Sequence, residues 1–243
     1  MRNSKISVVI PFYNEEDELD KLLFNIRKFE NKSNQVSEYL FIDDCSKDNS
    51  LKILKNFKKK QKILLSKKII IIKNKVNLGW AKTLKKGYKK SKSELTLFIP
   101  GDGEADLNQF LRKFDPEFDV IIFQRKDMRS RPLLRKIISK LYKYLICKIF
   151  FIKVLDLNGL IMIKTKKINK LKLFSNSFFI SAEIILKSHL LKLNIDRDKN
   201  FKLLIKNKYK SSSLNLKQLF LTLFDFIKMI LFCLNIFFKT FIK

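Results

Sequence analysis

The segment Ile6-Ser7-Val8-Val9-Ile10-Pro11-Phe12-Tyr13-Asn14-Glu15-Glu16 decides the fold of this chain of 243 residues. Its mostly apolar beginning, up to Pro11, predicts a buried strand. Asn14 can cap a following helix, whose first turn is acidic and whose apolar residues recur at helical spacing. A buried strand that runs into an amphipathic helix is typical of a unit in a parallel sheet.

The same alternation continues through the first half of the chain. Strands are predicted at residues 39–42, 69–72, 95–99 and 120–123, with amphipathic helices between several of them. This order predicts an α/β fold with a mostly parallel sheet sandwiched by helices. Ligands of such sheets bind beyond the carboxyl ends of the strands.

Polar side chains gather where the predicted strands end, and we expect them to converge on one crevice. They are Tyr13, Asn14 and Glu15 after the first strand, Asp43 and Asp44 after the second, Asp102 and Glu104 after the fourth, and Arg125 after the fifth. No Gly-x-Gly-x-x-Gly segment follows the first strand, and the chain has no Walker A lysine loop. These two absences count against a dinucleotide enzyme and a P-loop ATPase.

The second half of the sequence is less regular. Residues 133–151 predict a long helix, residues 158–163 a strand, and residues 181–193 a further helix. Residues 206–213 are polar and predict a loop.

The tail, residues 214–243, is strongly apolar, but Asp225, Lys228 and Asn235 interrupt it. Because no charge-free run reaches 18 residues, a clean transmembrane assignment fails. An in-plane interfacial helix or a helical hairpin fits better, and a helix that completes the core or a dimer interface is the alternative. We therefore divide the chain into a domain of residues 1–213 and an apolar, membrane-associating helical tail.

Lysine and arginine number 52 against 23 acidic residues, which gives a formal net charge of +29 at pH 7. We interpret most lysines as a solvated surface. An anionic membrane surface is the next interpretation and nucleic acid the last, because the lysines form no single basic arm. Three scattered cysteines and one histidine exclude a disulfide scaffold and a multi-histidine metal centre.

Arginine is scarce, yet four of the eight arginines are Arg125, Arg129, Arg131 and Arg135. Arginine makes planar bidentate contacts with phosphate, so this cluster suggests phosphate recognition. An exposed helix start with ordinary charges is the alternative. No signal-peptide region is visible near the N-terminus, and we expect a cytoplasmic, reduced protein.

Three segments, in order and at the usual spacing, resemble family-2 glycosyltransferases of GT-A fold. Residues 6–16 look like the opening of that family. Phe41-Ile42-Asp43-Asp44-Cys45-Ser46-Lys47-Asp48 is similar to its Asp-Asp-Gly-Ser-x-Asp element, with cysteine in place of the glycine. Asn77-Leu78-Gly79-Trp80-Ala81 resembles its Asn-x-Gly-x-(Gly/Ala) segment. The resemblance covers residues 4–125 well and extends more loosely to residue 213.

The second half resembles the polyprenyl-phosphate (dolichyl-phosphate) mannosyl- or glucosyltransferase branch of that family. The residues that carry this resemblance are Arg125, the Arg135 and Ser139 pair, the segment Asp156-Leu157-Asn158-Gly159, Glu183 and the basic loop 206–213. The resemblance implies a GT-A, Rossmann-like fold with an apolar helical tail. It also implies a protein at the cytoplasmic face of the cell membrane, peripheral or anchored by that tail.

The resemblance further implies a site for a UDP- or GDP-sugar donor. Its residues would be Pro11, Tyr13, Glu15, Ile42, Asp44, Gly101 and Asp102. Asp102 is the last position of the family's Asp-x-Asp metal motif, whose first aspartate is Pro100 here. Glu104 could supply a second oxygen ligand, and Mg²⁺ or Mn²⁺ is the expected metal.

The leading hypothesis is an inverting transferase that moves a sugar to polyprenyl phosphate, with Asp102, Arg125 and Glu183 as catalytic residues. Arg131, Arg135, Ser139 and Lys210 would hold the acceptor phosphate. That phosphate is already an anion and needs no general base. If the acceptor is instead a hydroxyl of an envelope polysaccharide, Glu183 is the candidate base, and its alternative is a helix carboxylate paired with a lysine. We expect His189 to be structural or exposed.

Two further hypotheses remain. Pro100 in the metal motif suggests a non-catalytic, nucleotide-sugar-binding membrane protein, because lost ligands accompany lost activity. Net charge alone suggests a nucleic-acid binder, which we do not expect.

Overall fold

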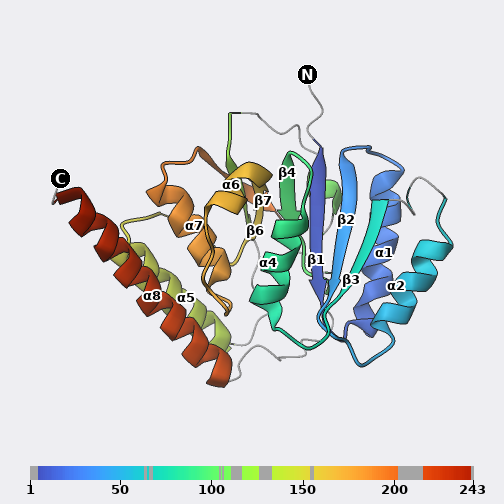
Figure 1. Cartoon of the computed structure of the whole chain (residues 1–243), viewed down its shortest axis with the longest axis horizontal. Coiled ribbons are helices and arrows are strands. Elements are labelled where there is room, and N and C mark those ends of the chain that lie inside the picture. The colour runs from blue at the N-terminus through green and yellow to red at the C-terminus, as the bar shows by residue number, and fades with distance from the viewer. Residues whose placement is uncertain are drawn as a thin grey trace.

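The computed structural model describes residues 5–62, 65, 68–103, 105, 107–110, 117–125, 133–153, 156–201 and 216–241. These residues form a seven-stranded sheet in the order β3-β2-β1-β4-β6-β5-β7 (Figure 1). The strands are β1 (Ile6–Phe12), β2 (Val36–Asp43), β3 (Ile69–Lys73), β4 (Leu95–Phe98), β5 (Val120–Arg125), β6 (Leu160–Lys164) and β7 (Ile195–Phe201). Strand β6 pairs antiparallel with β4 and β5, and the other pairs are parallel.

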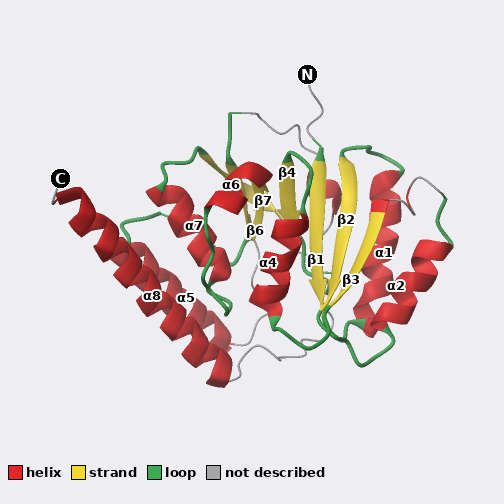
Figure 2. Ribbon diagram, in the orientation of Figure 1, coloured by secondary structure: helices red, strands yellow, loops and turns green. Residues whose placement is uncertain are grey.

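Helices cover both faces of this sheet, as Figure 2 shows. They are α1 (Glu16–Glu30), α2 (Ser50–Lys59), α4 (Trp80–Lys90), α5 (Leu133–Ile149), α6 (Thr165–Lys170), α7 (Ile180–Leu190) and α8 (Leu216–Phe241), with a short 3-10 helix at Leu107–Phe110. The predicted α/β class with a mostly parallel, helix-covered sheet is confirmed. The five strands predicted in the first half are all present.

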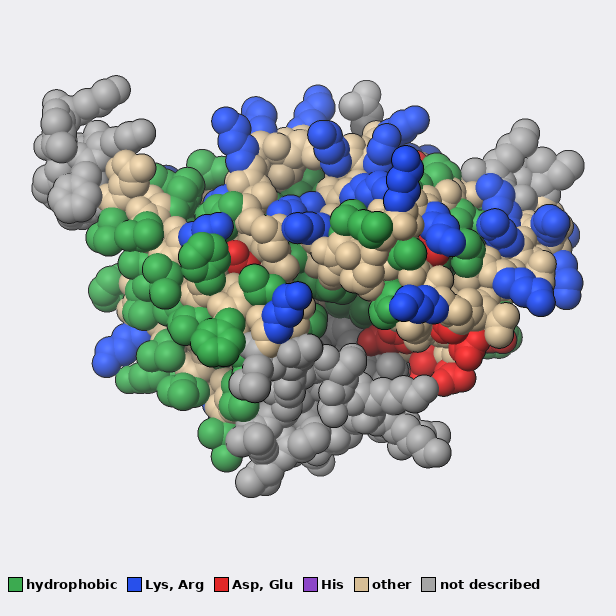
Figure 3. All heavy atoms as spheres, turned by 60° about the horizontal axis from the view of Figure 1, so that its bottom comes forward, with side chains coloured by type: hydrophobic (Ala, Val, Ile, Leu, Met, Phe, Trp, Pro, Cys, Tyr) green, Lys and Arg blue, Asp and Glu red, His purple; other side chains and the backbone are tan. Residues whose placement is uncertain are grey.

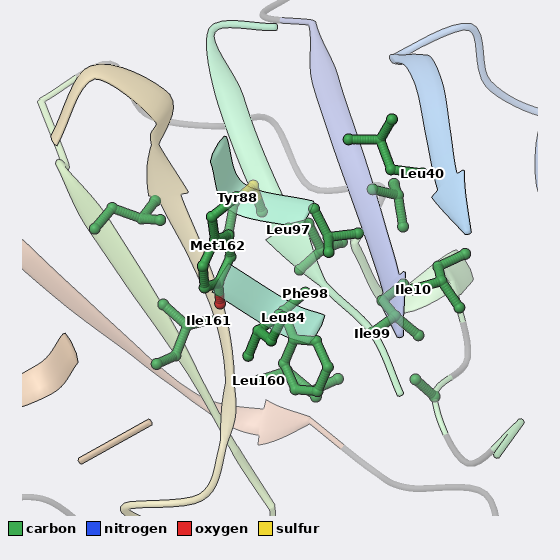
Figure 4. Close-up of a cluster of buried hydrophobic side chains, with 14 of the residues drawn as sticks. Ile10, Leu40, Leu84, Tyr88, Leu97, Phe98, Ile99, Leu160, Ile161 and Met162 are labelled. Atoms are coloured by element: carbon green, nitrogen blue, oxygen red, sulfur yellow. The ribbon is translucent and has the colours of Figure 1, made fainter. Parts of the chain in front are cut away.

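Part of the core lies between α4 and the sheet (Figure 4), and buried residues of α1 and α7 complete it. Leu84 and Tyr88 of α4 are buried there with Leu97 and other strand residues. The helix lies very close to β1, because a Cβ added to Gly87 would stand only 2.2 Å from Val9 Cγ1. Glycine is therefore required where α4 crosses β1.

Strand β7 and helix α6 were not predicted. Strand β7 has the sequence Ile-Asp-Arg-Asp-Lys-Asn-Phe, which offers no apolar run, and it pairs only with β5 at the edge of the sheet. An edge strand tolerates charged residues, so the period-based prediction fails there.

The apolar tail forms one continuous helix of 26 residues, so the helical-hairpin alternative is wrong for the described part of the tail. Helix α8 lies beside α5 at one end of the molecule (Figure 1). Phe226 of α8 packs edge-on against Phe150, just after α5, and against Phe179, just before α7, with ring centroids 6.1 Å and 6.0 Å apart. The domain and its tail are thus in direct contact.

Candidate functional site at the carboxyl edge of the sheet

The loops that follow β1 and β2 are tied together by hydrogen bonds. The N–H of Asn14 donates to Ser46 Oγ at 3.1 Å, and the N–H of Lys47 donates to Asn14 Oδ1 at 2.9 Å. Asn14 has a φ of 53°, in the left-handed region that asparagine tolerates better than most residues. The N–H of Glu15 donates to Ser50 Oγ at 2.8 Å. These contacts join the two loops into one rim above the sheet.

Asp44 extends the rim to the segment that follows β3. Its buried carboxylate accepts hydrogen bonds from Asn74 Nδ2 at 2.8 Å, the N–H of Leu78 at 2.8 Å and the N–H of Gly79 at 2.9 Å. A carboxylate that is buried needs such donors, because burial removes its hydration. Asp44 therefore holds the start of α4 against the end of β2.

The neighbouring Asp43 differs from Asp44 in one respect. Its Oδ1 accepts a hydrogen bond from the N–H of Ser46 at 2.8 Å, whereas its Oδ2 is buried and has no hydrogen-bond partner among the described residues. An unsatisfied buried acceptor is costly. Sequence reasoning placed Asp43 at this edge but assigned donor binding to Asp44, and nothing in the sequence distinguishes which of the two carries a free oxygen.

The loop after β4 crosses directly over the end of β1. A Cβ added to Gly101 would lie 2.6 Å from Phe12 Cβ and 3.1 Å from the carbonyl oxygen of Pro11. Only glycine permits this approach, and it brings the half-buried Asp102 to the end of β1. The residues that follow β1, β2 and β4 therefore lie together at one edge of the sheet.

An aromatic group lies between these loops and α7, and the sequence did not reveal it. The ring of Trp80, the first residue of α4, lies 5.4 Å from that of Phe98 at the end of β4 and 5.7 Å from that of Phe178. We call Trp80, Phe98 and Phe178 the aromatic wall. Phe178 is 98 positions from Trp80 in the sequence, so no local pattern could predict their contact.

The other predicted site residues are placed as follows. Pro11 and Ile42 are buried at the ends of β1 and β2, Glu15 is half-buried before α1, and Tyr13 is exposed. Arg125 ends β5 at the same edge and Arg135 lies on α5, and for both the structure describes the backbone. Ser139 lies one turn after Arg135 on α5 and is half-buried. Glu104, Arg131, Lys210 and the loop 206–213 lie outside the described residues.

Few side chains that could bind a metal ion lie together in the part of the chain that the structure describes. No group of three or more His, Cys, Asp or Glu side chains gathers there in a way that could hold an ion. Asp102 is half-buried in the loop that follows β4, and the side chain of Pro100 offers no metal ligand.

Glu183 lies in α7, and its carboxylate is fully occupied. Its two oxygens accept hydrogen bonds from the N–H groups of Phe174 and Ser175, both at 2.9 Å, and Lys187 Nζ lies 2.6 Å from Oε1. Glu183 is completely buried and Lys187 is nearly so. Lys187 Nζ also donates to the carbonyls of Leu171 and Lys172 and lies 4.3 Å from the centre of the Phe174 ring. This geometry favours the lysine-paired carboxylate over the general base.

His189 is partly buried at the other end of α7. Burial lowers its pKa, and the nearby Arg197, whose Nη2 is 3.5 Å from Nε2, lowers it further. The structural role expected for His189 is consistent with this position beside β7.

Comparison with known proteins places this geometry in a family. The protein-family model described as "Glycosyl transferase family 2" matches residues 7–182 of the sequence. The dolichyl-phosphate beta-glucosyltransferase of Dictyostelium discoideum is 31% identical over 46% of this chain and 35% of its own length. The undecaprenyl-phosphate 4-deoxy-4-formamido-L-arabinose transferase of Proteus mirabilis is 30% identical over 60% of this chain and 44% of its own. The chain thus spans less than half of these two curated relatives.

Solved structures share the fold at low sequence identity. A mannosyltransferase from Pyrobaculum calidifontis, solved with GDP-Man and Mn²⁺, superposes with a TM-score of 0.59 at 13% identity, covering 86% of this chain and 59% of that one. Mannosyl-3-phosphoglycerate synthase from Rubrobacter xylanophilus gives a TM-score of 0.66 at 12% identity, covering 97% of this chain and 75% of that one. These similarities confirm the predicted GT-A fold.

Proposed function

The chain belongs to glycosyl transferase family 2, and from that premise we propose that it is an inverting transferase that moves a sugar from a nucleotide-sugar donor to a polyprenyl phosphate. The observation that carries the proposal is the single rim built from the ends of β1, β2 and β4, closed by the contact of Gly101 with Phe12. The relatives whose names state a dolichyl or undecaprenyl phosphate acceptor support the choice of acceptor.

The donor nucleotide would lie on the rim. Pro11, Tyr13, Glu15 and Ile42 would surround the base and ribose, and Asp44 would act by holding the neighbouring backbone in place. The unpaired Oδ2 of Asp43 supports a bound ligand at this edge, because an N–H or O–H group of the nucleotide would satisfy it. UDP- and GDP-sugars are the donor classes to test.

The departing diphosphate needs positive charge. Asp102 and Glu104 are oxygen donors of the kind that Mg²⁺ and Mn²⁺ prefer, and they would hold the ion that offsets this charge. Arg125 ends β5 at the same edge and would add its own charge there.

The acceptor phosphate would be held by Arg135 and Ser139, which lie one turn apart on α5, together with Arg131 and Lys210. A phosphate anion attacks without losing a proton, so this reaction needs no general base. The complete pairing of Glu183 with Lys187 and two backbone N–H groups supports an acceptor of this kind over a sugar hydroxyl.

The lipid acceptor would be reached from the membrane surface on which α5 and α8 lie. Both helices expose apolar side chains on their outer faces, and Figure 3 shows hydrophobic side chains gathered over the end of the molecule that carries α8. We call this surface the apolar face. Its residues include Ile137, Leu141, Tyr144 and Leu145 of α5 and Phe220, Leu223, Phe224, Ile227 and Leu231 of α8.

Within the described residues, Lys217–Ile236 is long and apolar enough to cross a membrane, with a mean hydropathy of 2.0. The inner side of the same helix is nevertheless docked, since Asp225 is 2% exposed and Met229 fully buried. A spanning helix would lose these contacts and carry Asp225 into hydrocarbon, which is costly. We therefore propose that α8 lies in the plane of the cytoplasmic leaflet, where surface lysines of the chain contact anionic lipid headgroups.

The test is a transfer assay on the detergent-solubilised full chain. UDP-glucose, GDP-mannose and related donors are offered with Mg²⁺ or Mn²⁺, with and without undecaprenyl phosphate, and the lipid fraction is analysed by mass spectrometry. The expected result is a sugar-phosphate lipid from one donor. Donor hydrolysis without a lipid product would overturn the acceptor assignment, and donor binding without turnover would overturn the assignment as an enzyme.

A further inference from the structure

We propose that Asp225 of α8 is a positioning residue that holds Phe178 against Trp80, so that the seating of α8 on the domain controls the aromatic wall of the transfer site. This inference rests on the proposed function for the statement that the wall borders a transfer site. The contacts themselves stand independently of it.

Asp225 is the only acidic residue in α8 and is almost completely buried. Its Oδ2 accepts three hydrogen bonds, from the N–H of Asn176 at 2.9 Å, the N–H of Ser177 at 3.0 Å and Ser177 Oγ at 2.7 Å. Burying a carboxylate is unfavourable unless donors compensate it. The carboxylate therefore holds the segment that leads into α7 in place through hydrogen bonds.

The same contacts complete the start of α7. The residue before α7, Phe179, has no side-chain cap of its own, and its N–H donates to Ser177 Oγ at 3.1 Å. Ser177 in turn donates to Asp225, so a carboxylate lies near the N-terminus of α7, where the helix dipole favours negative charge. Releasing Asp225 would loosen residues 176–179 together.

Phe178 connects this segment to the site. It directly follows Ser177, and its ring meets that of Trp80 at 5.7 Å. Trp80 itself follows Gly79, whose N–H is held by Asp44 of the rim. Asn176 is held from the other side as well, because Lys85 Nζ of α4 donates to its Oδ1 at 3.0 Å. Residues 176–178 thus bridge α8 and α4.

Two properties make this bridge more than a packing contact. Phe178 is 37% exposed, so part of its ring remains available to a ligand at the edge of the sheet. The helix that carries Asp225 also carries the proposed membrane-facing side chains on its opposite side. A helix that left its seat to enter the bilayer would release Ser177, and the aromatic wall would lose the support of Phe178.

Trp80 is the single tryptophan of the chain, so its intrinsic fluorescence reports on the wall directly. The experiment compares the full chain in detergent with Asp225→Ala, with Asp225→Asn, and with Asn235→Ala as a matched control at an exposed polar position of the same helix. The readouts are Trp80 emission, acrylamide quenching, and kcat and KM for donor and lipid phosphate.

We expect Asp225→Ala to shift Trp80 emission to longer wavelength and to increase its quenching. Loss of a buried acceptor predicts a fall in kcat/KM of about tenfold. Asp225→Asn retains an oxygen acceptor and should restore most of both signals, and Asn235→Ala should match the unmodified protein.

Unchanged Trp80 emission and quenching in a folded Asp225→Ala protein would overturn the inference, whatever its activity. If Asp225→Ala does not fold, Ser177→Ala removes one of the three hydrogen bonds and tests the same path by the same fluorescence readouts. A clear Trp80 response in a chain that transfers no sugar would sink the proposed function and leave the positioning role of Asp225 intact.

Discussion

Glu16 and Asp48 each accept a hydrogen bond from the backbone of the other's loop. The N–H of Glu16, in the first turn of α1, donates to Asp48 Oδ2 at 3.1 Å, and the N–H of Asn49, which precedes α2, donates to Glu16 Oε2 at 2.9 Å. Asp48 Oδ1 also accepts hydrogen bonds from the N–H of Ser50 at 3.0 Å and from its hydroxyl at 2.6 Å. One carboxylate therefore caps two helices and holds the rim between them.

Asp48→Ala should destabilise the domain by about 2 kcal/mol, because it removes a cap from both helices. Denaturant unfolding followed by circular dichroism measures the change. Asp20→Asn, at an exposed position of α1, is the control and should lie within about 0.5 kcal/mol of the unmodified chain. Equal losses from the two substitutions would show that Asp48 does not cap.

The same carboxylate predicts a dependence of stability on pH. Burial raises the pKa of Asp48, but hydrogen bonds from the Ser50 hydroxyl and from the N–H groups of Ser50 and Glu16 outweigh it and leave the pKa below the ordinary value of 3.8. Because its folded-state pKa is lowered, the ionised carboxylate of Asp48 stabilises the folded protein fully above about pH 3.8. This stabilisation is lost as the pH falls through the folded-state pKa. The stability difference between the unmodified chain and Asp48→Asn should therefore shrink below this pH, and a constant difference would contradict the assignment.

Gly101→Ala should disrupt the site more than the fold. The added methyl group would stand 2.6 Å from Phe12 Cβ, so the loop that carries Asp102 must move away from β1. We expect transfer to fall about a hundredfold, since small displacements at a reacting centre have large effects, and stability to fall by about 1–3 kcal/mol.

Gly79→Ala is the comparison for Gly101→Ala. A Cβ at Gly79 meets no atom within 4 Å, so the strain there comes only from its φ of 83°. With a ψ of 157°, Gly79 lies in a backbone region that is essentially restricted to glycine, so the expected cost is about 1–3 kcal/mol. Full transfer by Gly101→Ala would show that the loop after β4 tolerates displacement.

Lys187→Met should destabilise the domain strongly, by about 3–5 kcal/mol, because it leaves the completely buried Glu183 without its cation. Glu183→Gln combined with Lys187→Met removes both charges and keeps an oxygen for one of the two N–H groups of Phe174 and Ser175, so it should recover part of that stability. If Glu183 has no role as a base, the double variant retains transfer when folded. A loss of transfer beyond about a hundredfold in the folded double variant would restore the general base.

The apolar face predicts binding to anionic vesicles. Leu141→Ser with Phe224→Ser replaces one side chain on each helix, at positions 57% and 55% exposed, and should weaken co-sedimentation with vesicles at least about tenfold. Phe24→Ser is the control, because Phe24 is 64% exposed on α1, outside the apolar face. A similar weakening by Phe24→Ser would point to unspecific adhesion.

The parts of the fold that could be predicted are those whose local sequence pattern indicates which residues are buried. Strand β1 is buried along its whole length and its sequence is an apolar run. The alternative stated for Glu183, a helix carboxylate paired with a lysine, agrees with its ion pair to Lys187, although no particular lysine was predicted. The mutual capping of Glu16 and Asp48 joins loops 32 residues apart in the sequence. The periodicity of apolar residues gives no information about such a contact.

The candidate site also has a part that could be predicted and a part that could not. Its location at the carboxyl edge of the sheet was predictable from the ends of the strands, because parallel strands present their carboxyl ends together. The free oxygen on Asp43 and the aromatic contact of Trp80 with Phe178 depend on the final packing of side chains from several elements. Such contacts are decided by tertiary structure, which a single sequence does not display.

The antiparallel direction of β6 has a consequence for how the chain can be rebuilt. Strands β5 and β6 are neighbours, with Phe123 opposite Leu160, so the chain leaves the sheet and re-enters it at almost the same point. The excursion between them contains α5 and is an insertion that the sheet does not need for its own continuity. Exchanging this insertion between related chains should therefore yield chimeras that keep one donor preference while adopting another acceptor.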